Sequence, residues 1–283
     1  MKTITSVNNE KIKQIVKIMS SPKERKYAGK YLVEGLRMVR EIPYDDIDNI
    51  FMTQNFYDKN VPNDSSILTL VNHAYEESRC YIVSDAVLKK LANTDHPQGI
   101  VATVKMHEYT IKDILKSGEY DLSGENAPLI IVVERLQDPG NMGTIIRTAE
   151  GAGVSGIIVS YDSVDVYSPK VVRSTMGSIF RKKIVITYDL IGDIAKLKEA
   201  GIETYGLHLD GTSIYDADLT GPAALIIGNE GAGLSEEISS QTDKLLRIPM
   251  RGRVESLNAA ASATIVMYEA MRQRIADSGI AFL

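Results

Sequence analysis

The sequence has 283 residues, of which 44% are hydrophobic and 24% are charged, a balance that excludes a disordered chain and allows one large domain or two ordinary ones. It has no apolar run long enough to cross a bilayer and no secretory signal. Cys80 is its single cysteine, which excludes an intramolecular disulfide and argues against a cysteine-built zinc site. We therefore expect a cytoplasmic protein with no membrane partner, although its net charge of −5 argues mildly against nucleic acid.

The charge is distributed unevenly along the chain. Residues 1–40 contain ten Lys or Arg and three Glu, a charge of +7, which leaves −12 for the other 243 residues. A basic segment of this kind indicates either a nucleic-acid-binding face or a solvated helix surface, and charge alone leaves both open.

The first half of the sequence mixes helical and extended patterns. Its apolar spacing predicts a basic helix near 8–19, a strand at 31–35 that leads into a helix, strands at 51–53 and 81–84, and a helix, loop and strand over 88–104.

A polar stretch at 107–127, rich in turn formers towards its end, precedes a strongly apolar run. We expect it to be a linker, with a small α/β domain at 1–106 and a second domain at 128–283.

The second half alternates apolar, β-branched runs with helical segments. Near-continuous apolar strands separated by helices predict a buried, mostly parallel α/β sheet. The expected strands are 129–134, 156–160, 184–188, 202–208, 223–227 and 244–248, and the expected helices are 142–152, 169–179, 190–200 and 256–275.

The first segment that carries chemistry, residues 137–149, follows a predicted strand and opens a helix. Asn141 can cap that helix, Gly143 permits close backbone approach, and Arg147 lies about one and a half turns further on. Its guanidinium could hold a phosphate, or it could pair with a surface carboxylate on an ordinary capped helix.

The second segment, residues 225–235, runs from an apolar strand into a turn with Gly228, Gly231 and Gly233, and predicts a short helix from Ser235. Glycines at this density let backbone N–H groups surround a ligand, although a tight connection would need one or two of them. The spacing is not that of a dinucleotide or triphosphate site, which disfavours a nucleotide-dependent Rossmann-type enzyme. Glu230 could bind neighbouring N–H groups or an arginine.

The third segment, residues 246–258, ends a strand at Pro249 and continues as a basic loop. Ser256 is the expected cap of the long final helix, and capping is the ordinary explanation for Ser256 and Asn258. Met250 and Leu257 could equally be core residues.

In this order the three segments resemble the three signature motifs of the SpoU/TrmH branch of the SPOUT methyltransferases. The motif residues are Asn141-x-Gly143-x-x-x-Arg147, Gly228-x-Glu230-x-x-Gly233, and Ile248-Pro249-Met250 followed by Ser256-Leu257-Asn258. The resemblance covers residues 128–275. Residues 6–104 resemble, less specifically, the small substrate-binding domain that often precedes this fold.

The resemblance implies an α/β catalytic domain with a trefoil knot that holds S-adenosylmethionine. It further implies a homodimer packed through the knot region, with the final helix as an interface candidate. By the same resemblance the cofactor-binding residues would be Gly228, Glu230, Gly233, Ile248, Met250 and Leu257.

The implied reaction is methyl transfer to a ribose 2′-hydroxyl of RNA. Arg147 matches the arginine that contacts the target phosphate, and we expect it to stabilise the developing alkoxide, because an arginine side chain is a poor base at neutral pH. Asn141, Glu230, Ser256 and Asn258 would orient Arg147 and the ribose.

The small domain is expected to bind the RNA, through residues that include Arg25, Lys26, Arg37 and Arg173. The fused domain favours ribosomal over transfer RNA. The alternatives are the same reaction on transfer RNA and a non-catalytic RNA-binding or ribosome-assembly protein with this fold. The histidines show no ligand spacing, so no metal is expected.

Overall fold

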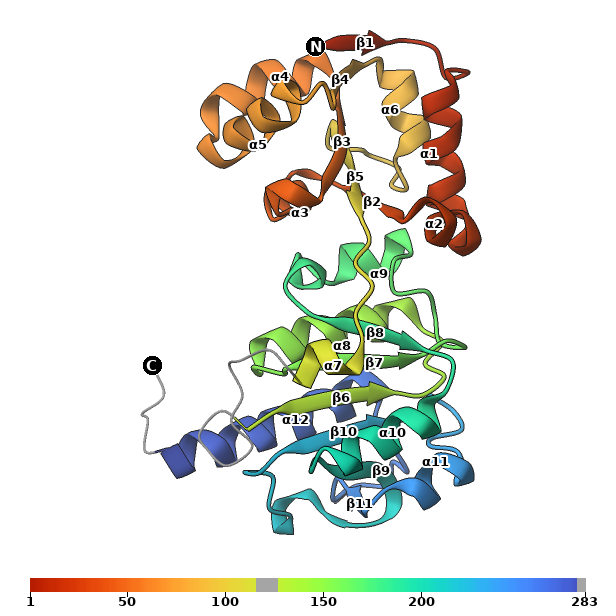
Figure 1. Ribbon diagram of the computed structural model, residues 1–283, viewed down its shortest axis with the longest axis vertical. Helices are drawn as coiled ribbons and strands as arrows, with labels where there is room; N and C mark the ends of the chain where they lie inside the picture. Colours follow the sequence, from red (N-terminus) through yellow and green to blue (C-terminus); the bar gives the residue numbers. More distant parts are fainter. Residues whose placement is uncertain (116–126, 279–283) are drawn as a thin grey trace. The chain divides into compact units, whose positions relative to one another are not determined.

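A computed structural model describes residues 1–115 and 127–278 of the chain (Figure 1). The chain divides into two compact units. The first contains Met1–His107 and Asp165–Phe180, and the second contains Glu108–Val164 and Arg181–Leu283. None of the helices in the described part is both long enough and apolar enough to span a bilayer.

The first unit is built on a mixed five-stranded sheet of order β1-β4-β3-β5-β2. The β1, β4 and β3 strands are parallel neighbours, whereas β5 is antiparallel to both β3 and β2. The strands are β1 (Lys2–Ile4), β2 (Lys30–Glu34), β3 (Ile47–Met52), β4 (Cys80–Val83) and β5 (Ile100–Lys105).

Six helices of the N-terminal segment accompany this sheet. The first, α1, begins after Asn9, whose side chain accepts from the Lys11 N–H, and its apolar side is buried. In Figure 1 α1 and α6 cover one face of the sheet. The helices are α1 (Glu10–Ser20), α2 (Pro22–Ala28), α3 (Leu36–Arg40), α4 (Gln54–Asn60), α5 (Ser65–Glu76) and α6 (Asp85–Leu91).

Residues 165–180 belong to the first unit although they follow segment 137–149 of the second unit in sequence. The Asp165 carboxylate pairs with the buried Arg25 guanidinium at 2.5 Å, and the Tyr167 ring lies 4.9 Å from that of Tyr31. The helix expected at 169–179 is shorter: α9 (Pro169–Ser174) ends where Met176 and Gly177 adopt positive φ, and a 3₁₀ turn follows. The division therefore departs from the expected one, which placed this segment in the second domain.

The second unit contains a six-stranded sheet of order β11-β9-β10-β6-β7-β8, and every neighbouring pair is parallel. Its central strands β6 and β10 are buried along their whole length, as their unbroken apolar sequences predict. The strands are β6 (Leu129–Val133), β7 (Gly156–Ser160), β8 (Ile184–Thr187), β9 (Glu203–Ser213), β10 (Ala223–Ile227) and β11 (Lys244–Arg247).

Helices lie on both faces of this sheet (Figure 1). On one face α7, α10 and α11 contribute Ile114, Ile194, Leu197 and Ile238 to a core with alternate residues of the central strands. On the other face α8 and α12 pack against each other. The helices are α7 (Ile111–Leu115), α8 (Pro139–Gly151), α10 (Leu190–Glu199), α11 (Glu236–Gln241) and α12 (Ala259–Ser278).

The parallel arrangement fixes where the chemistry-bearing segments lie. The carboxyl ends of parallel strands meet at one edge of the sheet, where α/β proteins bind their ligands. Segments 137–149, 225–235 and 246–258 leave the carboxyl ends of β6, β10 and β11.

Candidate active site

The segment after β6 forms the start of α8. Asp138 caps this helix by accepting from the Asn141 N–H at 2.8 Å, and Pro139 occupies the first turn. The expectation that Asn141 is the cap was therefore wrong, because the cap position falls before Pro139. Asn141 instead lies within the helix, 9% exposed, and its side-chain amide is directed to other partners.

The glycine-rich turn after β10 is closed by its own backbone. Asn229 and Gly233 exchange two hydrogen bonds of 3.0 Å, and the Asn229 side chain accepts from Gly231 and Ala232 N–H groups. A Cβ atom on Gly228 would lie 2.2 Å from the carbonyl carbon of Gly233, so only glycine fits there. The short helix predicted from Ser235 is α11, which begins one residue later and is capped by the Ser235 side chain.

Glu230, in this turn, binds the start of α8. Its carboxylate accepts from the backbone N–H of Gln137 at 3.0 Å, from that of Asp138 at 2.8 Å and from the Asn141 amide at 3.1 Å. Burial raises the pKa of Glu230, but these hydrogen bonds together hold the pKa below its usual value of 4.5. Glu230 is therefore ionised at neutral pH and fixes the second segment to the first.

Asn258 connects the third segment to the same network. Its amide donates to the Asn141 side-chain oxygen at 2.9 Å, while its own oxygen accepts from Ala260 and Ala261 N–H groups at the start of α12. The expected cap, Ser256, is exposed and lies before the helix, so the capping role belongs to Asn258.

Arg147 lies on α8 with an exposed side chain. Within the described part of the chain no carboxylate forms an ion pair with Arg147. The alternative interpretation, a surface salt bridge on an ordinary capped helix, therefore does not apply among these residues. The Arg147 guanidinium is accessible to an external anion.

A cavity of about 310 Å³, a size typical of small-molecule sites, lies beside this network. All six residues expected to bind the cofactor line it: Gly228, Glu230, Gly233, Ile248, Met250 and Leu257. Ser256 also lines it, whereas Asn141, Arg147 and Asn258 lie outside its lining. No sequence motif indicated its remaining wall, which includes Leu207, His208 and Leu209 of β9 and Ser262 of α12.

The four residues expected to contact RNA all belong to the first unit. Arg25 is 4% exposed, and its guanidinium donates to Asp165 and to the Ile18 and Met19 carbonyls. It is therefore a structural residue, which corrects the expectation of a phosphate contact. Lys26 and Arg37 are exposed, and Arg173 is half-buried.

Known proteins are similar to this chain in both sequence and fold. Residues 128–268 match the SpoU rRNA Methylase family, and residues 9–102 match the MRM3-like substrate binding domain. An uncharacterized tRNA/rRNA methyltransferase of Synechocystis is 34% identical over 98% of this chain and 96% of its own. The chain belongs to the SpoU family of RNA methyltransferases.

Two further relatives bear on the chemistry of this SpoU protein. The 23S rRNA (guanosine(2553)-2′-O)-methyltransferase RlmP of Bacillus subtilis is 30% identical over 95% of this chain and 98% of its own. The S-adenosylmethionine-bound rRNA methyltransferase of Sinorhizobium meliloti superposes with a TM-score of 0.79 and 28% identity over 96% of this chain and 97% of that one.

A second solved structure, AviRb of Streptomyces viridochromogenes with the same cofactor, has a TM-score of 0.78 and 29% identity over 95% of this chain and 99% of its own. The predicted fold class, a SpoU-type α/β methyltransferase domain preceded by a small α/β domain, is confirmed by these likenesses.

Proposed function

We propose that this SpoU protein transfers a methyl group from S-adenosylmethionine to a ribose 2′-hydroxyl of ribosomal RNA. The observation that carries the proposal is the convergence of Asn141, Glu230 and Asn258, one from each signature segment, beside a cavity lined by all six expected cofactor residues. RlmP, named for this reaction on 23S rRNA, is similar over nearly the whole chain.

The cavity fits S-adenosylmethionine in its chemistry. Gly228, Gly233 and the rest of the turn bring backbone N–H and C=O groups to its wall, while Ile248, Met250 and Leu257 supply apolar surface. The cofactor supplies a methyl group activated by a positively charged sulfur. Backbone groups bind the polar parts of such a ligand, and apolar side chains cover its uncharged parts.

The chain's own residues must assist loss of the proton from the 2′-hydroxyl. Arg147 is permanently charged, so it stabilises the alkoxide that develops and holds the neighbouring RNA phosphate, which can accept the proton. Asn141, Glu230 and Asn258 fix the beginning of α8 relative to the cavity, and Ser256 lies on the cavity wall where it can orient the ribose.

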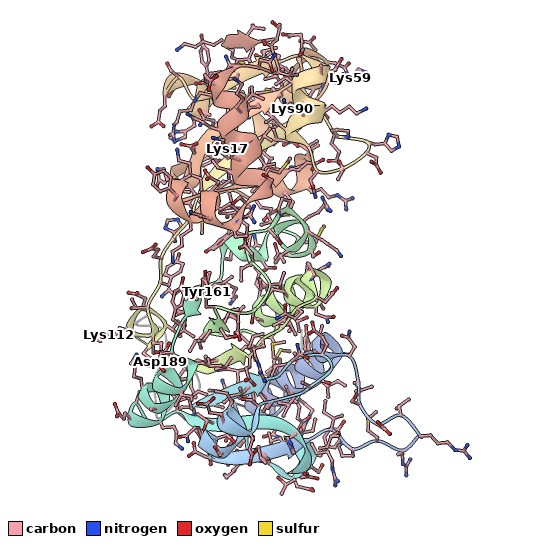
Figure 2. All side chains as sticks on the ribbon, turned by 90° about the vertical axis from the view of Figure 1, so that its right-hand side faces the viewer. Lys17, Lys59, Lys90, Lys112, Tyr161 and Asp189 are labelled. Carbon is pink, nitrogen blue, oxygen red and sulfur yellow. The ribbon has the colours of Figure 1, made fainter. Side chains whose placement is uncertain are left out.

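The first unit is the proposed RNA-binding part. Lys26, Arg37 and Arg173 are candidate phosphate contacts there, and Figure 2 labels two further lysines, Lys17 and Lys90, which are exposed on the neighbouring helices α1 and α6. Phosphate contacts by such residues supply affinity, and the match to a substrate-binding domain supports this role. Ribosomal RNA is favoured over transfer RNA as the substrate.

A cytoplasmic homodimer associated through the second unit is the proposed assembly. Helix α12 buries Ala260, Ala263 and Ala270 within its own chain and leaves Tyr268 45% exposed. Tyr268 is therefore the residue of α12 that we expect to contact the second copy.

The function is tested by mapping ribose methylation in ribosomal and transfer RNA from a strain with and without the gene. Loss of one 2′-O-methyl group from ribosomal RNA is the expected result. Loss of a 2′-O-methyl group from transfer RNA alone would overturn the proposal that ribosomal RNA is the substrate. Unchanged methylation of both RNAs would support the non-catalytic alternative, and calorimetry with S-adenosylmethionine would then show no binding.

A further inference from the structure

A stacked pair of tyrosines lies at the carboxyl edge of the sheet in the second unit, outside the cavity described above. Tyr161 follows β7 and Tyr188 follows β8, and the Tyr161 N–H donates to the Thr187 carbonyl at 2.8 Å. The ring centroids are 4.0 Å apart with an interplanar angle of 27°. The pairing of two neighbouring parallel strands therefore fixes both rings in one stack.

Both rings are largely open to solvent. Tyr161 is 58% exposed and Tyr188 is 67% exposed. Exposed tyrosines that lie singly, such as Tyr215, need no explanation, but a contiguous aromatic surface of two rings is an interaction site in many proteins. Two stacked rings that remain exposed gain little from burial, so stability alone does not account for the pair.

The pair borders a hollow of about 440 Å³ that is separate from the cofactor cavity. Its lining includes Leu190, Ile191 and Ile238, from α10 and α11, as apolar surface. Figure 2 shows Tyr161 and Asp189, which both line the hollow, on the same side of the second unit.

The charges around the hollow select against phosphate. Its lining holds one guanidinium, Arg135, and four carboxylates, those of Glu134, Asp162, Asp189 and Glu237. A phosphate group would be repelled by this excess of negative charge. A flat, uncharged ring whose amino groups can donate to carboxylates is compatible with it.

Three of these polar groups are held in place. The Arg135 backbone has φ of 50°, its N–H donates to Ser160 Oγ at 2.8 Å, and its guanidinium Nε lies 3.2 Å from Glu134. Ser160 Oγ also donates to Asp162 at 2.6 Å, and Asp189 caps α10 through the Gly192 N–H at 2.9 Å. The hollow thus presents preformed acceptors beside an aromatic surface.

The hollow is also linked to the catalytic network. Glu134 accepts from the Ser235 N–H at 2.9 Å, and the Arg135 carbonyl accepts from the Asn229 amide at 2.8 Å. The glycine-rich turn that lines the cofactor cavity is therefore bound directly to the wall of this second hollow.

We infer that Tyr161 and Tyr188 form a stacking platform for an unpaired nucleobase of the RNA substrate, away from the ribose that is methylated. The inference rests on the proposed function, because it assumes that RNA is the substrate. Proteins that bind unpaired RNA stack its bases on exposed aromatic rings. Adenine, with a large ring surface and an amino group, suits this platform better than uracil.

The test compares binding of oligoadenylate and oligouridylate to the full-length wild-type protein and to the double variant Tyr161→Ala/Tyr188→Ala. We expect the double variant to bind oligoadenylate about ten-fold more weakly and to lose the preference over oligouridylate. The salt dependence of binding should not change, because the platform makes no phosphate contact.

Two controls separate stacking from a general loss of structure. Tyr161→Phe/Tyr188→Phe retains both rings and should bind oligoadenylate like the wild type. Tyr215→Ala removes a ring of similar exposure, 60%, that does not line the hollow, and should change nothing. The thermal transitions and the S-adenosylmethionine affinity of all variants should equal those of the wild type.

Unchanged oligoadenylate affinity in the double alanine variant would overturn the platform, as would a shallower salt dependence, which would indicate a phosphate contact. Failure of the proposed function has a different signature. In that case the wild type would methylate no RNA, whatever the binding of the tyrosine variants.

Discussion

The side-chain amide of Asn258 donates to the side-chain oxygen of Asn141 at 2.9 Å, across 117 positions of sequence. Asn141 in turn donates to Glu230 at 3.1 Å, so a single asparagine connects all three signature segments. Because Asn141 uses both its oxygen and its nitrogen, its orientation is fixed, and with it the relation of α8 to the cofactor cavity.

Replacing Asn141 should therefore impair catalysis more than cofactor binding. Asn141→Ala removes the partner of both Glu230 and Asn258, so we expect the turnover number for RNA methylation to fall by about ten-fold or more. Thr144→Ala, an exposed position on the same helix, is the matched control and should leave turnover unchanged. Equal turnover in the Asn141 variant and the control would contradict a positioning role for this network.

The low pKa of Glu230 predicts a pH-dependent contribution to stability. A carboxyl group whose pKa is lower in the folded than in the unfolded state stabilises the fold at pH values above its usual pKa of 4.5. This contribution disappears as the pH falls through the pKa of the folded state. Glu230→Gln should therefore unfold more easily than the wild type at neutral pH, with a difference that shrinks as the pH falls below 4.5. Chemical denaturation at several pH values measures it. A difference that is constant with pH would show that ionised Glu230 is not the stabilising form.

Gly228 should be essential to the cofactor cavity. The Cβ of Gly228→Ala would lie 2.2 Å from the Gly233 carbonyl carbon and 2.3 Å from the Leu234 nitrogen, both backbone atoms, so the turn would have to open. We expect loss of S-adenosylmethionine binding by calorimetry, with the first unit still folded. Gly221→Ala meets no atom within 4 Å and should bind like the wild type. Normal binding by the Gly228 variant would exclude this turn as the cofactor site.

Arg25 and Arg37 should differ in their effects although both are arginines of the first unit. Arg25 is buried and ion-paired, so Arg25→Met leaves Asp165 and two carbonyls without their donor. The free energy of unfolding should fall by roughly 2–4 kcal/mol. This loss is smaller than that expected for a fully buried ion pair, because the Asp165 side chain is 22% exposed. Arg37→Ala, at an exposed position, should weaken RNA binding with little effect on stability. Paired denaturation and RNA-binding measurements decide between these roles, and the reverse pattern would restore Arg25 as an RNA contact.

The sequence was most informative where local patterns determine structure. The apolar runs predicted all six strands of the second unit, with β9 alone longer than expected because it continues to Ser213. Residues of the second and third motifs line one cavity, and Asn141 of the first motif is hydrogen-bonded to both of those segments. The three motifs meet because each follows a parallel strand and parallel strands end at one edge.

The capping errors were avoidable in part. Asp138 followed by Pro139 is itself a helix-start pattern, so the cap before α8 could have been assigned to Asp138 rather than to Asn141. At α12, Ser256 and Asn258 are both good caps, and only the backbone decides that the helix begins after Asn258.

Long-range pairing could not be predicted from one sequence. The contact between Arg25 and Asp165 joins positions 140 residues apart, and nothing near either residue indicates the other. The same holds for Leu207 to Leu209, which line the cofactor cavity without belonging to a motif, and for the stacked pair Tyr161 and Tyr188. Part of the expected linker, residues 116–126, lies outside the described residues.

The central claim is methyl transfer to a ribose oxygen assisted by Arg147. The most direct measurement is transfer of labelled methyl groups from S-adenosylmethionine to ribosomal RNA by the wild type and by Arg147→Ala, followed by digestion to nucleosides. We predict label in a 2′-O-methylribonucleoside with the wild type, a loss of about a hundred-fold or more in the variant, and equal cofactor affinity in both proteins. Label on a base, or equal transfer by the two proteins, would contradict the account.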